Sequence, residues 1–190
     1  MPGALAGTLA VVRGIAPPQL AAPTPCTDFD VRALLNHLMG VFMVAGTAGG
    51  KAAEVDPATF AEDRTGGDWL ATFEALAEAA RLAWVPAAAW QGHTAVFGRA
   101  FPAAVAGRML ISELVVHGWD LARATRQPYR PDADAVRVVH RHYSSTLVTQ
   151  RTSAWGPPVP VPPSAPVLDR ALGLSGRDPG WRPLDADDRR

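Results

Sequence analysis

Residues 113–122, ELVVHGWDLA, place a glutamate, a histidine and an aspartate inside an apolar run. Each residue of an α-helix turns the chain by about 100 degrees. With Glu113 at zero, His117 lies about 40 degrees to one side and Asp120 about 20 degrees to the other. The apolar residues that flank them on this face are Ala106, Met109, Leu110, Val116, Leu121 and Ala124. No Lys or Arg shares the face, and an unpaired buried carboxylate costs several kcal/mol, so Glu113 needs a partner from another element.

The segment LLNHL, residues 34–38, supplies a candidate partner on a second predicted helix. His37 lies in the middle of an apolar stripe there. The stripe contains Ala33, Leu34, Val41 and Val44, and the residues predicted to point away are Arg32, Leu35 and Met39. If the two stripes face one another, His37, Glu113 and His117 meet, and two imidazoles with one carboxylate suit a divalent cation. The alternative is a core histidine hydrogen-bonded to the glutamate, with no metal.

The rest of the chain shows helical periodicity and almost no alternating strand pattern, which predicts an all-α fold. Thr27, with Asp30 three residues later, is the expected N-cap of the second helix, and Asp68 and Asp132 are the expected N-caps of the third and fifth. Residues 86–101 are expected to form a structured loop. The predicted helices cover residues 4–15, 28–45, a stretch from 68 through 84, 102–125, 132–150 and 167–172. We expect one domain over residues 1–183, including a proline-rich extended segment, and a disordered tail over residues 184–190.

Composition argues against several classes of function. Eighteen basic and eighteen acidic side chains give no net charge, so no nucleic-acid partner is expected. The apolar N-terminus has no preceding Lys or Arg, and no apolar run approaches the ~20 residues of a membrane span, so no membrane partner is expected either. A single cysteine, Cys26, fits a cytoplasmic location, and nothing near it in sequence favours a catalytic thiolate.

The remaining polar candidates are weaker. His140 and His142 are two residues apart on a predicted helix and point to different sides, so both are expected to be structural or exposed. His93 is expected to be an exposed polar residue of the loop. Possible contacts for an anionic substrate are Arg32, Arg99, Arg108 and Arg123, of which all but Arg99 turn away from the predicted site.

Three segments, PCTDFDVRALLNHLMG, ISELVVHGWDLARATRQP and GRDPGWRP, resemble actinobacterial proteins of the DinB/YfiT-like superfamily. The resemblance spans roughly residues 5–183 and is strongest to the N-terminal domain of mycothiol-dependent maleylpyruvate isomerase. It implies a four-helix bundle, here with an extra helix and the proline-rich C-terminal segment, that holds a metal between its helices. The family's ligand positions fall on His37, Glu113 and His117. Asp120 is a candidate to hold a ligand imidazole in one tautomer.

The resemblance implies a divalent metal ion, zinc or nickel first and iron as a further option, with mycothiol as a co-substrate. The expected function is a metal-dependent thiol transferase or isomerase in which the bound ion activates a low-molecular-weight thiol or water. The expected partners are a small-molecule thiol and an electrophile, and the protein is expected to form a homodimer if it is oligomeric. The isomerase relatives carry a further C-terminal domain for which this sequence has no room, so we do not expect maleylpyruvate isomerase activity. The alternative is a non-enzymatic metal-binding or stress-response module that dimerises through its helices.

Overall fold

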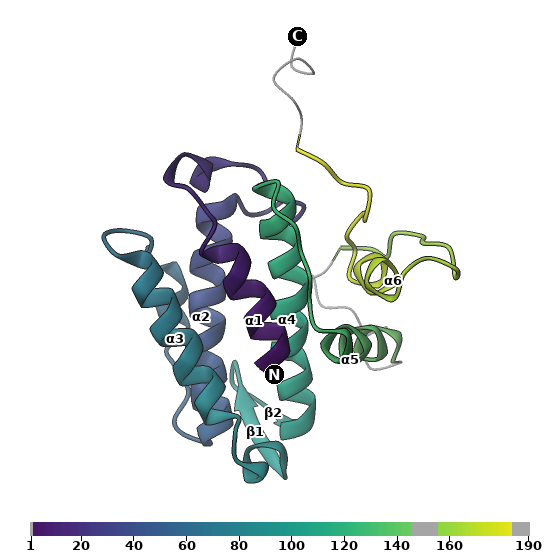
Figure 1. The fold of residues 1–190 in the computed structure, drawn as a ribbon. Helices are drawn as coiled ribbons and strands as arrows, with labels where there is room; N and C mark the ends of the chain where they lie inside the picture. The colour runs from purple at the N-terminus through teal and green to yellow at the C-terminus, as the bar shows by residue number, and fades with distance from the viewer. Residues whose placement is uncertain (1, 146–155, 184–190) are drawn as a thin grey trace.

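The computed structural model describes residues 2–145 and 156–183. Its described part is mostly helical, as predicted, with one small two-stranded sheet (Figure 1). The α-helices are α1 (Pro2–Val12), α2 (Val31–Gly50), α3 (Trp69–Ala83), α4 (Ala103–Ala124), α5 (Ala133–Ser144) and α6 (Val167–Leu174). The strands are β1 (His93–Val96) and β2 (Arg99–Pro102), and short 3-10 helices are η1 (Pro17–Ala21), η2 (Pro57–Ala61) and η3 (Ala87–Trp90).

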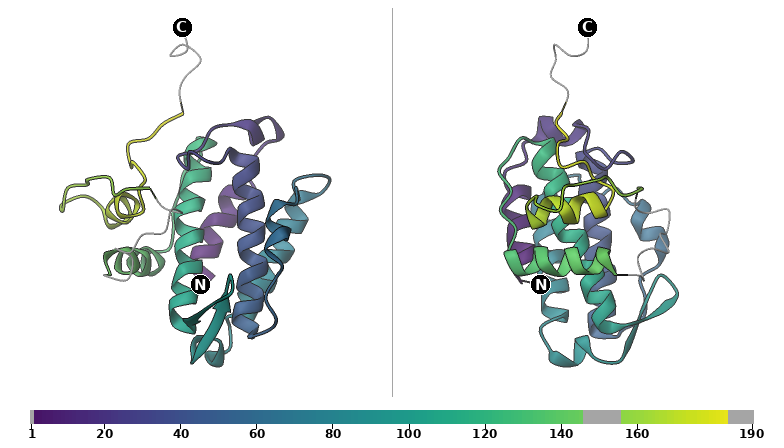
Figure 2. Two further views of the ribbon diagram at one scale, coloured as in Figure 1. Left: turned by 180° about the vertical axis from the view of Figure 1, so that it is seen from behind. Right: turned by 90° about the vertical axis from the view of Figure 1, so that its right-hand side faces the viewer.

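Helices α1 to α4 form the bundle, and α4 lies on the side of it that faces α5 and α6. It packs against α1 and α2 inside the bundle and against α5 outside it, while α6 packs on α5. Figure 2 shows α5 and α6 running across the outer side of α4 instead of along it. Residues 112 and 114–122 of α4 are therefore buried all round the helix, and not on one stripe alone.

Helix α2 begins later than predicted. Asp30, not Thr27, is its N-cap, and the Asp30 carboxylate accepts a hydrogen bond from the Ala33 backbone N–H at 2.8 Å. The preceding residues fold back as a loop that pairs Pro23 with Asp30 in an isolated bridge, so Thr27 is held in a turn outside the helix. Cys26 consequently lies in a loop at the start of α2.

Helix α2 also continues past its predicted end near Ala45, because glycines that suggest a loop serve close packing here. A Cβ on Gly49 would lie 2.8 Å from the Trp84 indole nitrogen, so only glycine admits this ring. The indole N–H donates to the Ala45 carbonyl at 2.8 Å. The helix ends where Lys51 adopts a left-handed conformation.

With this length, α2 has the size and hydropathy of a membrane-crossing helix, contrary to the expectation that no segment approaches one. The core helix of a bundle has the same properties, and half of the most apolar window of α2 is buried. Its contacts with α3 and α4 account for that burial.

Residues 86–101, predicted to be a loop, form η3 and most of a β-hairpin. Val96 pairs with Arg99, which leaves Phe97 and Gly98 as a two-residue turn with positive φ at both positions. Such turns usually carry Asn-Gly or Asp-Gly, and the Phe-Gly pair found here is not a sequence pattern that predicts a hairpin. The hairpin is anchored to the bundle by the Thr94 hydroxyl, which donates to the Ala48 carbonyl of α2 at 2.7 Å.

The later helices begin where they were predicted to begin. Asp68 and Asp132 cap α3 and α5 as predicted. Helix α5 ends at Ser144, and Gln150, its predicted end, lies outside the described residues. Residues 156–162 have no regular secondary structure, consistent with their prolines, and the predicted tail at residues 184–190 also lies outside the described part.

Candidate metal centre

Three side chains from α2 and α4 meet at the face where these helices pack. The Glu113 Oε2 atom lies 3.0 Å from His37 Nε2 and 3.2 Å from His117 Nε2. The two imidazole rings lie edge to face with centroids 5.0 Å apart. The structure thus brings together the trio predicted from helical spacing, with one ligand atom from each residue within 4.8 Å of the others.

His37 lies at the edge of the buried face of α2 and not in its middle, so that prediction was wrong. Leu35 and Met39, predicted to point away, are fully buried, whereas Val41 and Val44 are partly exposed. The reason is that α3 packs on α2 beside α4 and widens its buried face. His37 keeps 25% of its side chain exposed, and His117 only 4%, so the cluster opens to solvent on the His37 side.

The spacing of the trio matches what a small cation requires. Ligand atoms about 2.0–2.1 Å from a tetrahedral zinc ion lie roughly 3.3 Å apart. The observed separations of 3.0 and 3.2 Å are close to that value. They also fit hydrogen bonds from the two imidazoles to one carboxylate oxygen, so these distances match both a metal site and a hydrogen-bonded cluster.

The contact between Glu113 and His117 lowers the pKa of the glutamate and raises the pKa of the histidine. Burial would raise the pKa of Glu113, but hydrogen bonds from His117 and His37 outweigh it and hold the pKa well below its usual range. Burial would lower the pKa of His117, but hydrogen bonds to Asp120 and Glu113 outweigh it and raise the pKa. The site therefore holds a carboxylate and favours positive charge on its partner, a charge that a proton or a cation can supply.

Asp120 contacts His117 on the other side of the imidazole. His117 Nδ1 lies 2.9 Å from Asp120 Oδ2, inside a region where Asp120 is completely buried. A proton on Nδ1 donated to this carboxylate leaves the Nε2 lone pair facing Glu113. This is the carboxylate–histidine arrangement that orients imidazole ligands at metal sites.

Arg177, which no pattern in the sequence indicated, neutralises Asp120. Its Nη2 donates to Asp120 Oδ2 at 3.0 Å and its Nε to Oδ1 at 3.3 Å, and its side chain is 5% exposed. A Schellman motif at the end of α6 positions it: the Arg177 N–H donates to the Leu172 carbonyl and the Gly176 N–H to that of Gly173. Gly176 has φ +83°, as this motif requires.

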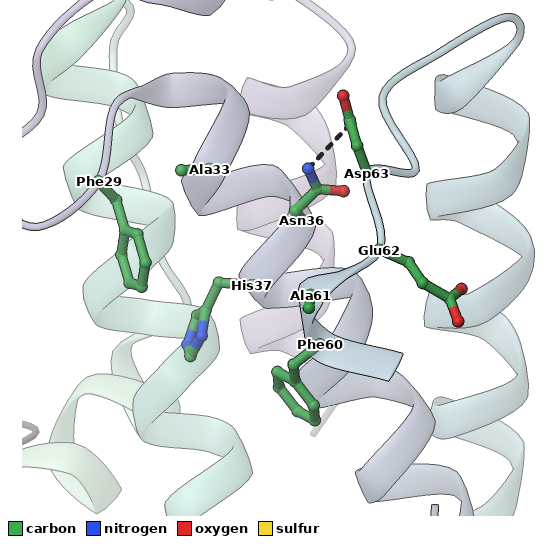
Figure 3. Close-up of a pocket in the computed structure, with 8 residues that line it drawn as sticks. All are labelled: Phe29, Ala33, Asn36, His37, Phe60, Ala61, Glu62 and Asp63. Carbon is green, nitrogen blue, oxygen red and sulfur yellow. Dashed lines mark hydrogen bonds between the residues drawn. The ribbon is translucent and has the colours of Figure 1, made fainter. Parts of the chain in front are cut away.

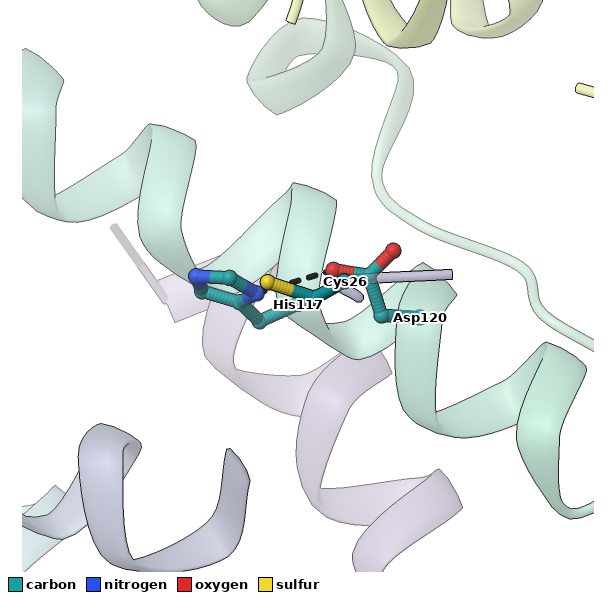
Figure 4. Close-up of side chains that lie close together, drawn as sticks. All are labelled: Cys26, His117 and Asp120. Carbon is teal, nitrogen blue, oxygen red and sulfur yellow. Dashed lines mark hydrogen bonds and ion pairs between the residues drawn. The ribbon is translucent and has the colours of Figure 1, made fainter. Parts of the chain in front are cut away.

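Cys26 also lies beside Asp120 and His117, although sequence gave no reason to expect it there (Figure 4). One potential ligand atom from each of these residues lies within 4.8 Å of the others. Burial raises the pKa of the thiol to about 11, although Arg177 acts to lower it. Because Arg177 already neutralises Asp120, this second group has less need of a cation than the His37, Glu113 and His117 trio.

A pocket of about 330 Å³ opens beside His37 (Figure 3). Phe29 stacks on the His37 ring with centroids 5.2 Å apart, and Phe60 lies on the other side at 6.4 Å. The other lining residues are Ala33, Asn36, Ala61, Glu62 and Asp63. The candidate ligand cluster and the pocket therefore share His37.

The arginines considered as substrate contacts make other contacts. Arg32 donates to Thr65 at 2.6 Å. Arg99 and Arg123 lie over aromatic rings at 5.7 and 5.5 Å. Arg108 lies on α4, and the Ser112 hydroxyl donates to its backbone carbonyl at 2.9 Å. None of these four lines the pocket beside His37.

The other histidines lie outside the trio. His93 is exposed at the start of β1, as predicted. His140 and His142 are partly buried on α5, where burial and nearby arginines lower their pKa values.

Comparison with known proteins finds a matching family. The family model described as the mycothiol maleylpyruvate isomerase N-terminal domain matches residues 3–122, and this family is DinB/YfiT-like. The match covers α1 to α3 and most of α4, including the trio and Asp120, and ends before Arg177. No curated protein and no solved structure matches the chain.

Proposed function

Because the chain belongs to the mycothiol maleylpyruvate isomerase N-terminal domain family, we propose that it binds a divalent cation through His37, Glu113 and His117. The observation that carries this proposal is the convergence of two imidazole Nε2 atoms on one carboxylate oxygen, with His117 braced from behind by Asp120. Two imidazoles with one carboxylate suit zinc or nickel, and also ferrous iron.

The chemistry we propose is transfer of a low-molecular-weight thiol of the mycothiol type to an electrophile, or a thiol-assisted isomerisation. Three protein ligands leave at least one coordination position open, and a bound cation lowers the pKa of a thiol or water held there. The chain's own residues contribute placement. Asp120 and Arg177 fix the deeply buried His117, and the partly exposed His37 lies where small molecules enter.

Metal content of the purified protein tests the binding step. We expect about one equivalent of a divalent metal by mass spectrometry in the wild type. His37→Ala should lose it, and His93→Ala, which removes an exposed histidine of the hairpin, should retain it. Near-zero metal in both the wild type and His37→Ala contradicts the proposal, as does equal loss in the two variants.

Activity separates an enzyme from a binding module. With metal bound, we expect conjugation of a low-molecular-weight thiol to an electrophile, and His117→Ala should abolish it. A metal-loaded protein that is inactive with every thiol tested would favour the alternative of a non-enzymatic metal-binding or stress-response module.

A further inference from the structure

The pocket beside His37 continues toward the surface as a row of rings. We name Phe29, His37, Phe60 and Phe97 the aromatic strip. Phe29 and Phe60 flank His37, as Figure 3 shows, and Phe97 contacts Phe60 with centroids 5.5 Å apart. The strip joins residues from the loop before α2, from α2, from η2 and from the β-hairpin turn, so four segments place aromatic side chains together.

Phe97 is the member of the strip whose side chain is most exposed to solvent. It is 57% exposed, among the few large apolar side chains that the described structure leaves in solvent. It also has φ +51°, a conformation that disfavours bulky side chains. The Glu54 carboxylate, in the loop that follows α2, accepts a hydrogen bond from the Gly98 N–H at 3.0 Å and ties the turn to that loop. An exposed ring held in a disfavoured conformation is typical of a binding surface more than of a folding element.

The polar rim of the pocket is occupied by its own contacts. The Asn36 amide donates to Asp63 at 3.0 Å and accepts from the Arg64 N–H at 2.7 Å. The Arg64 guanidinium pairs with Glu62 at 2.9 Å. Arg32 Nη1 lies 3.9 Å from the Asp63 carboxylate, so each rim carboxylate has an arginine beside it. No Lys or Arg is among the described residues that line the pocket itself, so an anion that enters it meets the two carboxylates and no lining cation.

A second pocket has the opposite character. It measures about 290 Å³, and Arg123, Arg126 and Arg182 line it at the C-terminal end of α4. Anionic ligands have better electrostatic partners there. The two pockets therefore differ in charge, and the pocket that contains the candidate metal ligand His37 is the aromatic one, with two carboxylates and no lysine or arginine in its lining.

We propose that the pocket beside His37 binds the neutral, flat apolar part of the electrophile, stacked along the aromatic strip, and that it rejects carboxylate-bearing groups. The assignment of this ligand as the electrophile rests on the proposed thiol chemistry. The binding preference itself rests on the four rings and the two carboxylates of the rim. Ring stacking along the strip aligns the substrate with His37, next to the open side of the ligand cluster.

Site-resolved NMR on the metal-free, full-length protein tests the preference. The probes are 2-naphthol and 2-naphthoate, which share one ring system and differ in charge at neutral pH. We expect 2-naphthol to shift the backbone amides of Ala33 and Ala61 in a saturable manner. We expect 2-naphthoate to bind there about fivefold more weakly, because its carboxylate faces Glu62 and Asp63 with no cation in the pocket lining, and repulsion between exposed like charges costs about 1 kcal/mol.

Two surface variants make the test specific to the strip. Phe97→Ala should weaken 2-naphthol binding roughly two- to tenfold, the range of one aromatic pair. Leu82→Ala removes another exposed apolar side chain, 54% accessible on α3, and should leave it unchanged. Equal binding of both probes at Ala33 and Ala61 would overturn the proposal. So would the absence of 2-naphthol binding there, or equal effects of the two variants.

Because the NMR experiment uses metal-free protein, it tests ligand binding independently of the proposed metal site. If 2-naphthol binds as expected while the metal-content experiment finds no metal, the neutral binding site stands and the assignment of its ligand as an electrophile is overturned. If metal binds and 2-naphthol does not, the metal site stands and this proposal is overturned.

Discussion

Replacing Arg177 with methionine should destabilise the metal-free protein by about 3 kcal/mol, because it leaves the Asp120 carboxylate buried without a cation. Asp120 is fully buried and Arg177 is 5% exposed, so solvent cannot take the place of the guanidinium. Loss of one partner of a buried pair costs roughly 3–5 kcal/mol. The lower end applies here because His117, with its raised pKa, still donates to Asp120 and can carry a compensating proton.

Urea unfolding followed by circular dichroism measures this loss, and thermal unfolding should show a midpoint lowered by roughly 6–12 °C. Arg182→Met is the matched control, because Arg182 is exposed and donates to a backbone carbonyl at 3.0 Å. It should change stability by less than about 0.5 kcal/mol. Adding Asp120→Asn to Arg177→Met removes the stranded charge and should recover much of the loss. The reasoning is refuted if Arg177→Met lowers the free energy of unfolding by less than about 1 kcal/mol, or if the double variant is no more stable than Arg177→Met alone.

Three further outcomes follow from individual contacts. Cys26, with a pKa of about 11, should react with iodoacetamide about twentyfold more slowly than free cysteine near pH 8. Its thiolate is roughly 200-fold less populated, and the greater nucleophilicity of that more basic thiolate offsets part of this difference. A rate equal to that of free cysteine would be inconsistent with the burial of Cys26. Gly118→Ala should cost about 1–3 kcal/mol in urea unfolding, because its Cβ would lie 2.7 Å from the Tyr129 hydroxyl, whereas Gly46→Ala meets open space and should not destabilise α2. Zinc affinity, measured against a chromophoric chelator, should fall as the pH is lowered from about 8 to 6, because a proton competes for His117, whose pKa is raised; a flat profile would argue against His117 as a ligand.

The helices were predictable from the sequence, because amphipathic spacing and capping residues are local properties. Asp68 and Asp132 cap the helices that follow them as expected. The N-cap of α2 was missed because Thr27 and Asp30 both have capping side chains, and pairing of Pro23 with Asp30 selects the later one. The hairpin was missed because Phe97 stands where its turn usually carries Asn or Asp.

The candidate trio was found because Glu113 and His117 are one turn apart on one helix, and His37 interrupts an apolar helix elsewhere. Asp120 was identified on the same helix, but Cys26 and Arg177 were not found, because they come from segments with no periodicity to indicate direction. Cys26 lies in a loop, and Arg177 is 57 residues away from the Asp120 that it contacts. The need of Glu113 for a partner was visible in the sequence, whereas the pairing of Asp120 with Arg177 depends on the way α6 packs on α5.

The central claim, that His37, Glu113 and His117 hold a divalent cation, is tested most directly by anomalous diffraction at the zinc edge from crystals grown with one equivalent of zinc. The account predicts a peak within about 2.0–2.2 Å of His37 Nε2, His117 Nε2 and a Glu113 carboxylate oxygen. A peak bound instead to Cys26 and Asp120, or no peak at the trio, would contradict it.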